Sequence, residues 1–266
     1  MNSFVELEHT PSPDWFRLPL TPAVCVGRPA ERFMLGGVGL AASIRVMEQR
    51  CQRSIAWATA QFVSFARASQ IVDLEFARLR SGQRLTQATV TARAEGELLF
   101  HVSGALVAKG KASSQDWISA PDVPTPDECP EGLHWRADDG GLHGRLEIRV
   151  AKGRYGRDRI GAPESDGRLI LWVRPREPVA IDCALLAVIA DLLPNGIGNA
   201  LGLNAGGSSL DNTIRIIRLT PTKWILAEIS IQTLDSGLGH GDVRMFAEDG
   251  CLLAVASQSL IVRIRD

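Results

Sequence analysis

The chain has 266 residues, of which 45 % are hydrophobic and 22 % are charged, and its formal net charge is −1. This composition is typical of a globular protein, and the near-neutral charge gives no support for a nucleic acid or an anionic membrane surface as a partner. The five cysteines are scattered without a CxxC pair or a short Cys/His spacing, so the pattern favours reduced thiols over a disulfide framework or a zinc site, and we expect no metal and no cofactor.

The amino-terminal segment lacks the features of a secretory signal. Its first twenty residues contain Glu6, Glu8 and Pro11, where a signal peptide needs an apolar core. The longest unbroken apolar run, 183–190, is far shorter than the roughly 20 residues that a membrane-spanning helix needs. We therefore expect a cytoplasmic protein without membrane insertion.

The first half of the chain predicts one helix followed by several strands. Residues 36–51 are rich in small and aliphatic side chains and contain no proline, which favours a helix. Strand-like runs at the spacing of β-hairpins follow it, at 59–68, 71–79, 85–94 and 97–108.

A proline-rich segment then separates two parts of the chain. Four prolines lie in residues 113–132, without hydrophobic periodicity, which indicates a linker that runs along the surface. We expect one domain over 1–112, a linker over 113–140 and a second domain over 141–266.

The second half repeats the order of the first. Two opening strands are predicted at 146–154 and 167–175, before a helix over 182–193 that Asp182 could cap. Strand-like runs follow this helix at 210–219, 223–233, 242–248 and 251–264.

A residue-by-residue match supports a duplication. The turn dipeptides Glu95-Gly96 and Asp249-Gly250 are 154 positions apart, and each stands where a hairpin needs a left-handed residue. The same interval pairs Leu98 with Leu252 and Ser103 with Ser257, along with three further pairs. The shared order of elements makes duplication a better explanation than chance.

The helices of both halves lack a polar stripe, so each must be buried on every side. A curved antiparallel sheet around such a helix buries all of its faces. The sequence therefore predicts an α+β fold, a tandem double hotdog in which each half wraps an antiparallel sheet around a buried helix. The two sheets can pair edge to edge within one chain.

Four stretches of the chain carry a resemblance to a known family. Residues 35–43, 74–106, 209–233 and 248–263 resemble the acyl-CoA thioesterase II family, the double-hotdog thioesterases. The resemblance implies a hydrolase of lipid metabolism that acts on acyl-CoA. It also makes larger homo-oligomers plausible, through the hotdog sheets.

The resemblance further implies a water held by three side chains of the second half. These are Asp191 on the helix, Ser209 before the Leu-Asp pair and Gln258 on the last strand. The sequence departs from the family where Asn212 replaces a usual histidine, where Ile216-Ile217 replaces an aromatic-histidine pair, and at Val38. Whether Asn212 or Asp211 takes part in the site stays open at this point.

Asp191 also stands out without the family. A carboxylate in an apolar helix is costly to bury, and at the end of the helix it meets the negative pole of the dipole. If the side chain is buried, both effects raise its pKa toward the range of a useful base. The structural alternative is an aspartate that reaches solvent, because Pro194 and Gly196 end the helix there.

Gln258 is the other internal signal. An amide in an apolar setting needs hydrogen-bond partners or costs about 1 kcal/mol or more. The alternation of the strand places it on one face with Leu252, Ala254, Ala256, Leu260 and Val262. Ser209 alone would be a turn or cap residue, and Asp211 is the rival acid, which we interpret as local structure at the strand entry.

The pair Gly36-Gly37 opens the first predicted helix. The first N–H groups of a helix have no internal partner, and glycine lets a ligand approach closely. We expect these residues to bind substrate, with the Gly37 N–H in an oxyanion hole for the thioester. Close packing of helix and sheet is the structural alternative.

The function favoured here is hydrolysis of an acyl-CoA to free acid and CoA, by direct attack of a water that Asp191, Ser209 and Gln258 hold. No GxSxG motif is present, which argues against a serine nucleophile. One alternative is a hotdog enoyl-CoA hydratase or dehydratase, which would need a histidine beside the helix acid, and neither predicted helix carries one. The other is a non-catalytic module that binds acyl-CoA or lipid.

Overall fold

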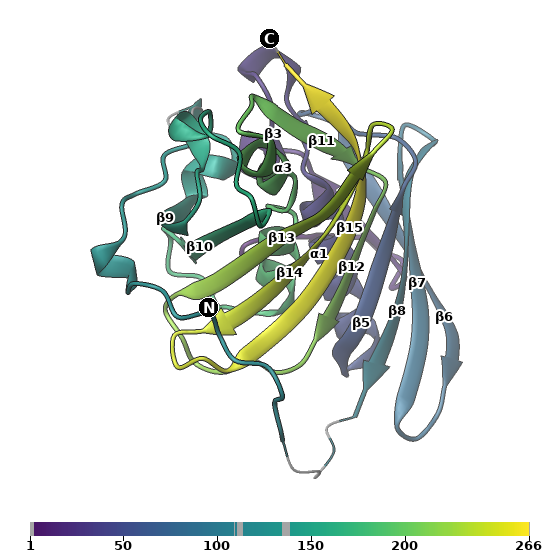
Figure 1. Ribbon diagram of the computed structural model, residues 1–266. Helices are drawn as coiled ribbons and strands as arrows, with labels where there is room; N and C mark the ends of the chain where they lie inside the picture. Colours follow the sequence, from purple (N-terminus) through teal and green to yellow (C-terminus); the bar gives the residue numbers. More distant parts are fainter. Residues whose placement is uncertain (1–2, 109, 111–113, 135–138, 266) are drawn as a thin grey trace.

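The computed structural model describes residues 3–108, 110, 114–134 and 139–265. One continuous sheet of 13 strands contains strands of both halves (Figure 1). The first half supplies β1 (Glu8–His9), β2 (Trp15–Pro19), β5 (Ser54–Phe62), β6 (Ile71–Ser81), β7 (Leu85–Ala94) and β8 (Glu97–Val107). The second supplies β9 (Leu146–Lys152), β10 (Arg168–Pro175), β11 (Ala205–Ser209), β12 (Asp211–Ile216), β13 (Ile225–Asp235), β14 (Leu238–Ala247) and β15 (Leu252–Ile264).

The order of the strands confirms the duplication. The sheet runs β1-β2-β6-β7-β8-β5 through the first half and then β12-β15-β14-β13-β10-β9 through the second, which is the same order in reverse. The interval of 154 residues relates the bounds of β6 to those of β13. The predicted α+β double hotdog is confirmed, including the opening strands of the second half.

The two halves meet where β5 pairs with β12 in antiparallel register. At the centre of this pair Thr59 lies opposite Thr213, and their hydroxyl oxygens are 2.6 Å apart. These two threonines are also separated by 154 residues. A pseudo-twofold axis therefore passes between equivalent residues of the two halves.

Helix α1 (Gly36–Cys51) is buried from Gly37 to Met47 apart from Arg45, as the prediction of a buried helix required, while its last turn is partly exposed. It packs against β5, β7 and β8, and also against helix α2 (Cys183–Ala190) of the other half. Figure 1 shows the curved sheet in front of these helices. One hydrophobic core includes side chains from both halves, so the halves do not have separate interiors.

The second helical region differs from the prediction. Helix α2 ends at Ala190, and a separate helix, α3 (Pro194–Leu201), follows after three residues. Pro194 ends the first helix but begins the next, because a proline at the first helical position loses no hydrogen bond. The 154-residue interval relates α1 to the region that contains α3, so α2 is an addition to the second half. Asp182 caps α2 as predicted, its side chain accepting the Leu185 N–H at 2.8 Å.

Helices α2 and α3 together span Cys183–Leu201. By length and apolar composition alone, this segment could cross a bilayer. However, 78 % of its most apolar stretch is buried inside the protein, and a helix in a protein core can have the same length and composition. The unbroken apolar run noted in the sequence, 183–190, is shorter because Asp191 interrupts it.

The described part of the expected linker packs against the outer face of the second half. Trp172 on β10 donates its indole N–H to the Pro124 carbonyl at 2.9 Å. Cys129 is buried against Trp172, Trp224 and Phe246, which together form a small second cluster on that face. Residues 135–138 of the expected linker and 111–112 of the expected first domain lie outside the described residues. A short ribbon of β3 (Cys25–Val26) and β4 (Phe33–Met34) precedes α1.

Candidate active site

Asp191 lies at the junction of the two halves. It is the C-cap residue of α2, and only 4 % of it is exposed. Its Oδ2 accepts the Gly37 N–H at 2.6 Å. The N-cap residue of α1, Leu35, offers no side-chain cap, so a carboxylate from the other half satisfies one of the unpaired N–H groups at the start of this helix. The alternative of a solvated aspartate is thereby wrong.

Gln258 reaches the same carboxylate from β15. Its Nε2 donates to Asp191 Oδ1 at 2.6 Å, and the residue is 1 % exposed. This bond satisfies the amide nitrogen in the apolar setting that the alternation predicted. The amide oxygen of Gln258 has no partner among the described residues.

Ser209 approaches Asp191 because the pairing of the strands is irregular. Along β15, Ser209 pairs with Leu260 and Thr213 with Ser257, so residues 210–212 lie opposite only two residues. Such an extra residue acts as a bulge and changes which side chains face inward. The Ser209 hydroxyl donates to Asp191 Oδ1 at 3.5 Å, a weaker bond than that of Gln258. The three side chains inferred from the family resemblance thus lie together.

Burial raises the pKa of Asp191 to about 6. Loss of hydration is the largest cause, because an ionised carboxylate is poorly stabilised in an apolar interior. Hydrogen bonds from the Gly37 N–H, the Gln258 amide and the Ser209 hydroxyl act in the opposite direction and keep the shift moderate. The carboxylate is therefore ionised at neutral pH and still a better base than an exposed aspartate.

The position of Gly37 corrects one expectation. Its N–H was predicted to bind the oxygen of a thioester, but the Asp191 carboxylate already occupies it. A Cβ atom at Gly37 would lie 2.6 Å from the Asp191 Cβ, so glycine is needed here for close packing of α1 on α2. Gly36 borders the same carboxylate, since a Cβ there would lie 3.3 Å from Oδ2, and it stays a candidate for substrate binding.

Two neighbouring residues of β12 behave differently from each other. Asp211, the rival acid, accepts the Ser259 N–H at 2.8 Å and stabilises the strand pairing, as the local interpretation predicted. Asn212 is fully buried, and neither polar atom of its side chain has a partner within the described part of the chain. The residue type alone did not predict that Asn212 is buried without a partner. The only sequence signal at this position was that asparagine replaces the usual histidine of the family.

The first half has no second copy of the site. The positions 154 residues before Asp191, Ser209 and Gln258 are Gly37, Ile55 and Gly104. A Cβ atom at Gly104 would lie 2.7 Å from the Met47 sulfur, so an apolar side chain fills the equivalent space. One chain therefore forms one site, and that site needs both halves because Gly37 belongs to the first.

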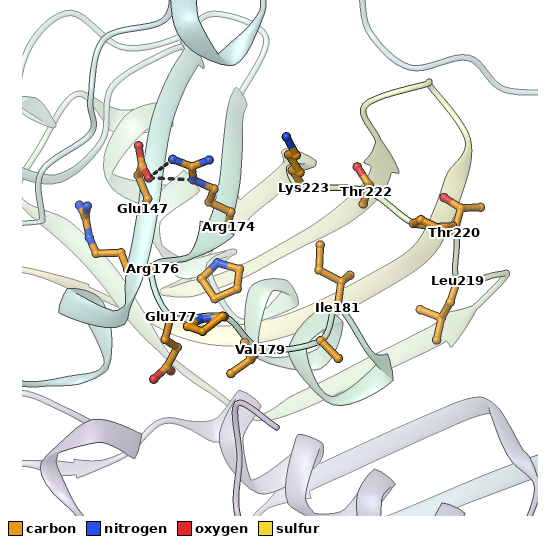
Figure 2. A pocket seen from close by; sticks show the side chains of 14 residues that line it. Glu147, Arg174, Arg176, Glu177, Val179, Ile181, Leu219, Thr220, Thr222 and Lys223 are labelled. Carbon is orange, nitrogen blue, oxygen red and sulfur yellow. Dashed lines mark hydrogen bonds and ion pairs between the residues drawn. The ribbon is translucent and has the colours of Figure 1, made fainter. Parts of the chain in front are cut away.

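An open hollow lies away from these three residues. A depression of about 870 Å³ is lined by the segment 178–181 just before α2 and by Arg174, Arg176 and Lys223 (Figure 2). Arg174 is paired with Glu147 at 2.7 Å. Asp191 lies at the other end of α2, and none of Asp191, Ser209 and Gln258 lines this depression. Over the described residues, no group of three or more His, Cys, Asp and Glu is arranged to hold a metal ion.

Known proteins share this architecture. The family model of the acyl-CoA thioesterase C-terminal domain matches residues 119–262. A proposed thioesterase from Novosphingobium aromaticivorans DSM 12444 has 31 % identity and a TM-score of 0.86, with 98 % of each chain covered. No curated protein matches.

Two more distant structures share the fold. The acyl-CoA thioesterase II TesB2 of Mycobacterium marinum has 20 % identity, a TM-score of 0.73 and coverage of 98 % of this chain and 97 % of that chain. A hotdog protein of unknown function from Alicyclobacillus acidocaldarius has 18 % identity, a TM-score of 0.83 and coverage of 99 % and 97 %.

The fold and its relatives define a thioester hydrolase of the double-hotdog class. The chain belongs to the acyl-CoA thioesterase family, and it is an acyl-CoA thioesterase. The resemblance seen in the four sequence stretches is confirmed.

Proposed function

We propose that the enzyme hydrolyses an acyl-CoA to free acid and CoA by direct attack of a water molecule at Asp191. The observation that carries this proposal is the buried carboxylate, which accepts hydrogen bonds from Gln258 and Gly37 at 2.6 Å each. Asp191 accepts a proton from the water as the water attacks the thioester carbon. Gln258 and Ser209 hold the carboxylate in position, and the unpaired Gln258 oxygen can accept the second hydrogen of the water.

The substrate chemistry fits a single carboxylate as the base. A thiol has a pKa near 8.5, so the thiolate of CoA leaves without strong help from a general acid. A base with a pKa of about 6 is ionised at neutral pH and close enough to the working pH to accept a proton in the transition state. A covalent acyl-enzyme intermediate is not required.

Replacement of the acid tests the proposal. In Asp191→Asn the amide of Gln258 can rotate so that its unpaired oxygen accepts from the new Asn amide, which keeps the local packing. We expect loss of thiol release from acyl-CoAs of graded chain length, measured with a thiol-reactive dye, with an unchanged circular dichroism spectrum.

Asp211→Asn is the matched control, since Asp211 is the neighbouring acid and bonds only the strand backbone at Ser259. We expect this variant to keep most of its activity. Full activity of Asp191→Asn would refute the proposed mechanism. Enoyl-CoA absorbance in the same assay would detect a hydratase, and saturable binding without turnover would indicate a binding module.

A further inference from the structure

Asn212 is a buried polar side chain, and no hydrogen bond within the described residues explains its burial. It is fully buried on β12, and both its Nδ2 and its Oδ1 lack a partner among the described residues. An unsatisfied buried polar group costs about 1 to 3 kcal/mol, so such groups need an explanation. Asn199 shows the ordinary case, since it is equally buried but accepts the Arg154 N–H at 2.7 Å and donates to the Arg168 carbonyl at 3.0 Å.

The pairing of the strands places Asn212 beside the site. On the inward face of β12 and β15, Ile214 lies opposite Ala256, and the next inward residues toward Ser209 are Asn212 and Gln258. On its other side Asn212 lies opposite Ala60 of β5, whose small side chain fills little space. Asn212 therefore lies next to the amide that holds Asp191, opposite a small side chain on the neighbouring strand.

The proposed reaction needs a hydrogen-bond donor for the carbonyl oxygen of the thioester, and Asn212 can supply it. When water attacks a thioester, the carbonyl oxygen gains negative charge close to the Asp191 carboxylate, and a hydrogen-bond donor must stabilise it. The Gly37 N–H, the donor expected from the sequence, is bonded to Asp191. Within the described residues, the Asn212 Nδ2 is a buried side-chain donor next to the site with no other partner.

We propose that the Asn212 amide donates a hydrogen bond to the carbonyl oxygen of the thioester and stabilises the oxyanion of the tetrahedral intermediate. The inference rests on the proposed function of Asp191. The water oxygen forms a bond to the carbonyl carbon and gives its proton to Asp191, while the carbonyl electron pair moves onto the oxygen held by Asn212. When the carbonyl re-forms, the carbon–sulfur bond breaks and CoA leaves as the thiolate.

Infrared spectroscopy of a bound substrate tests this bond directly. Asp191→Asn, which should not turn over, is loaded with an acyl-CoA that carries ¹³C at the thioester carbonyl. We expect the carbonyl stretch to lie at lower frequency than in free acyl-CoA, and to return toward the free value in the double variant Asp191→Asn/Asn212→Leu. An equal frequency in the two variants would overturn the inference, because other donors would then hold the oxygen.

Kinetics and stability separate a role in the reaction from a role in folding. Asn212→Leu keeps the branching of the side chain and removes both polar atoms, so we expect kcat to fall about 10²- to 10³-fold while the Tm stays equal or rises. Asn199→Leu is the control, since it breaks two hydrogen bonds and should lower the Tm without changing the carbonyl frequency. A lower Tm with unchanged kcat in Asn212→Leu would show a structural residue.

The two proposals fail separately. If Asp191→Asn is inactive and Asn212→Leu keeps full activity, the role of Asn212 is refuted and that of Asp191 stands. If Asp191→Asn is active, the proposed function itself is refuted.

Discussion

Gly37 donates its backbone N–H to the carboxylate of Asp191 at 2.6 Å, and the two residues are separated by the same 154 positions that relate the two halves of the chain. Equivalent positions of a duplicated unit thus face each other across the pseudo-twofold axis. Glycine at one copy leaves the space that the aspartate of the other copy occupies. The two halves of the chain therefore form one asymmetric site, whereas two identical halves would form two equivalent sites.

The first prediction concerns the dependence of activity on pH. The pKa of Asp191 is raised to about 6, and only its ionised form can accept a proton from water. We expect kcat/KM to rise with pH along a single-proton curve with a midpoint near 6 and to level off above about pH 7. Steady-state rates between pH 4.5 and 8 at constant ionic strength measure this, and a flat profile down to pH 5 would contradict it.

The same shift predicts a pH-dependent stability. Because the folded-state pKa of Asp191 lies above its unfolded value, the protonated form favours the folded state, and stability is lost as the pH rises through about 6. Urea denaturation of the native protein and Asp191→Asn, at pH 4 and at pH 7, measures the difference in free energy of unfolding. We expect that difference to move against the native protein by about 2 kcal/mol between the two pH values. Parallel pH dependence in the two proteins would show that Asp191 is not desolvated.

A third prediction tests the close contact between α1 and α2. A methyl group at Gly37 would lie 2.6 Å from the Asp191 Cβ and 2.9 Å from the Ala187 carbonyl oxygen. We expect Gly37→Ala to lower the free energy of unfolding by about 1 to 3 kcal/mol and kcat at least 10-fold, since the carboxylate must move. Gly110→Ala is the control, because nothing lies within 4 Å of the added atom there. Equal activities of the two variants would show that the helices have room to adjust.

The fourth prediction ranks the two side chains that hold Asp191. Gln258 donates at 2.6 Å and Ser209 at 3.5 Å, so Gln258 has the stronger bond to the carboxylate. We expect Gln258→Leu to lower kcat by about 10²-fold or more and Ser209→Ala by about 10-fold or less. Gln258→Leu should also move the acid limb of the pH profile to higher pH, because its hydrogen bond lowers the pKa of Asp191. The reverse ranking would assign the serine the main role.

Much of the fold could be predicted from local patterns. Three of these patterns lie within short stretches of sequence: the apolar character of 183–190, the hairpin spacing of the strands, and the repeat of Glu95-Gly96 at Asp249-Gly250. The structure has the corresponding helix, hairpins and turns. Gly96 and Gly250 both have positive φ, as the turn dipeptides required. Helix α3 was missed because Pro194 was interpreted only as a helix end, although it is equally suited to begin a helix.

The sequence by itself determined that the chain is duplicated, that Asp191 is an acid in an otherwise apolar stretch, and that Gln258 is an amide among apolar neighbours. The periodicity of side chains and the conformational limits of turns are local, so they can be seen without coordinates. Only the tertiary structure decided that Gly37 bonds Asp191, that an irregular pairing turns Ser209 inward, and that Asn212 lies buried without a partner. These outcomes depend on how two halves separated by 154 residues pack at β5 and β12, and the docking of distant segments is set by the shape of the whole core.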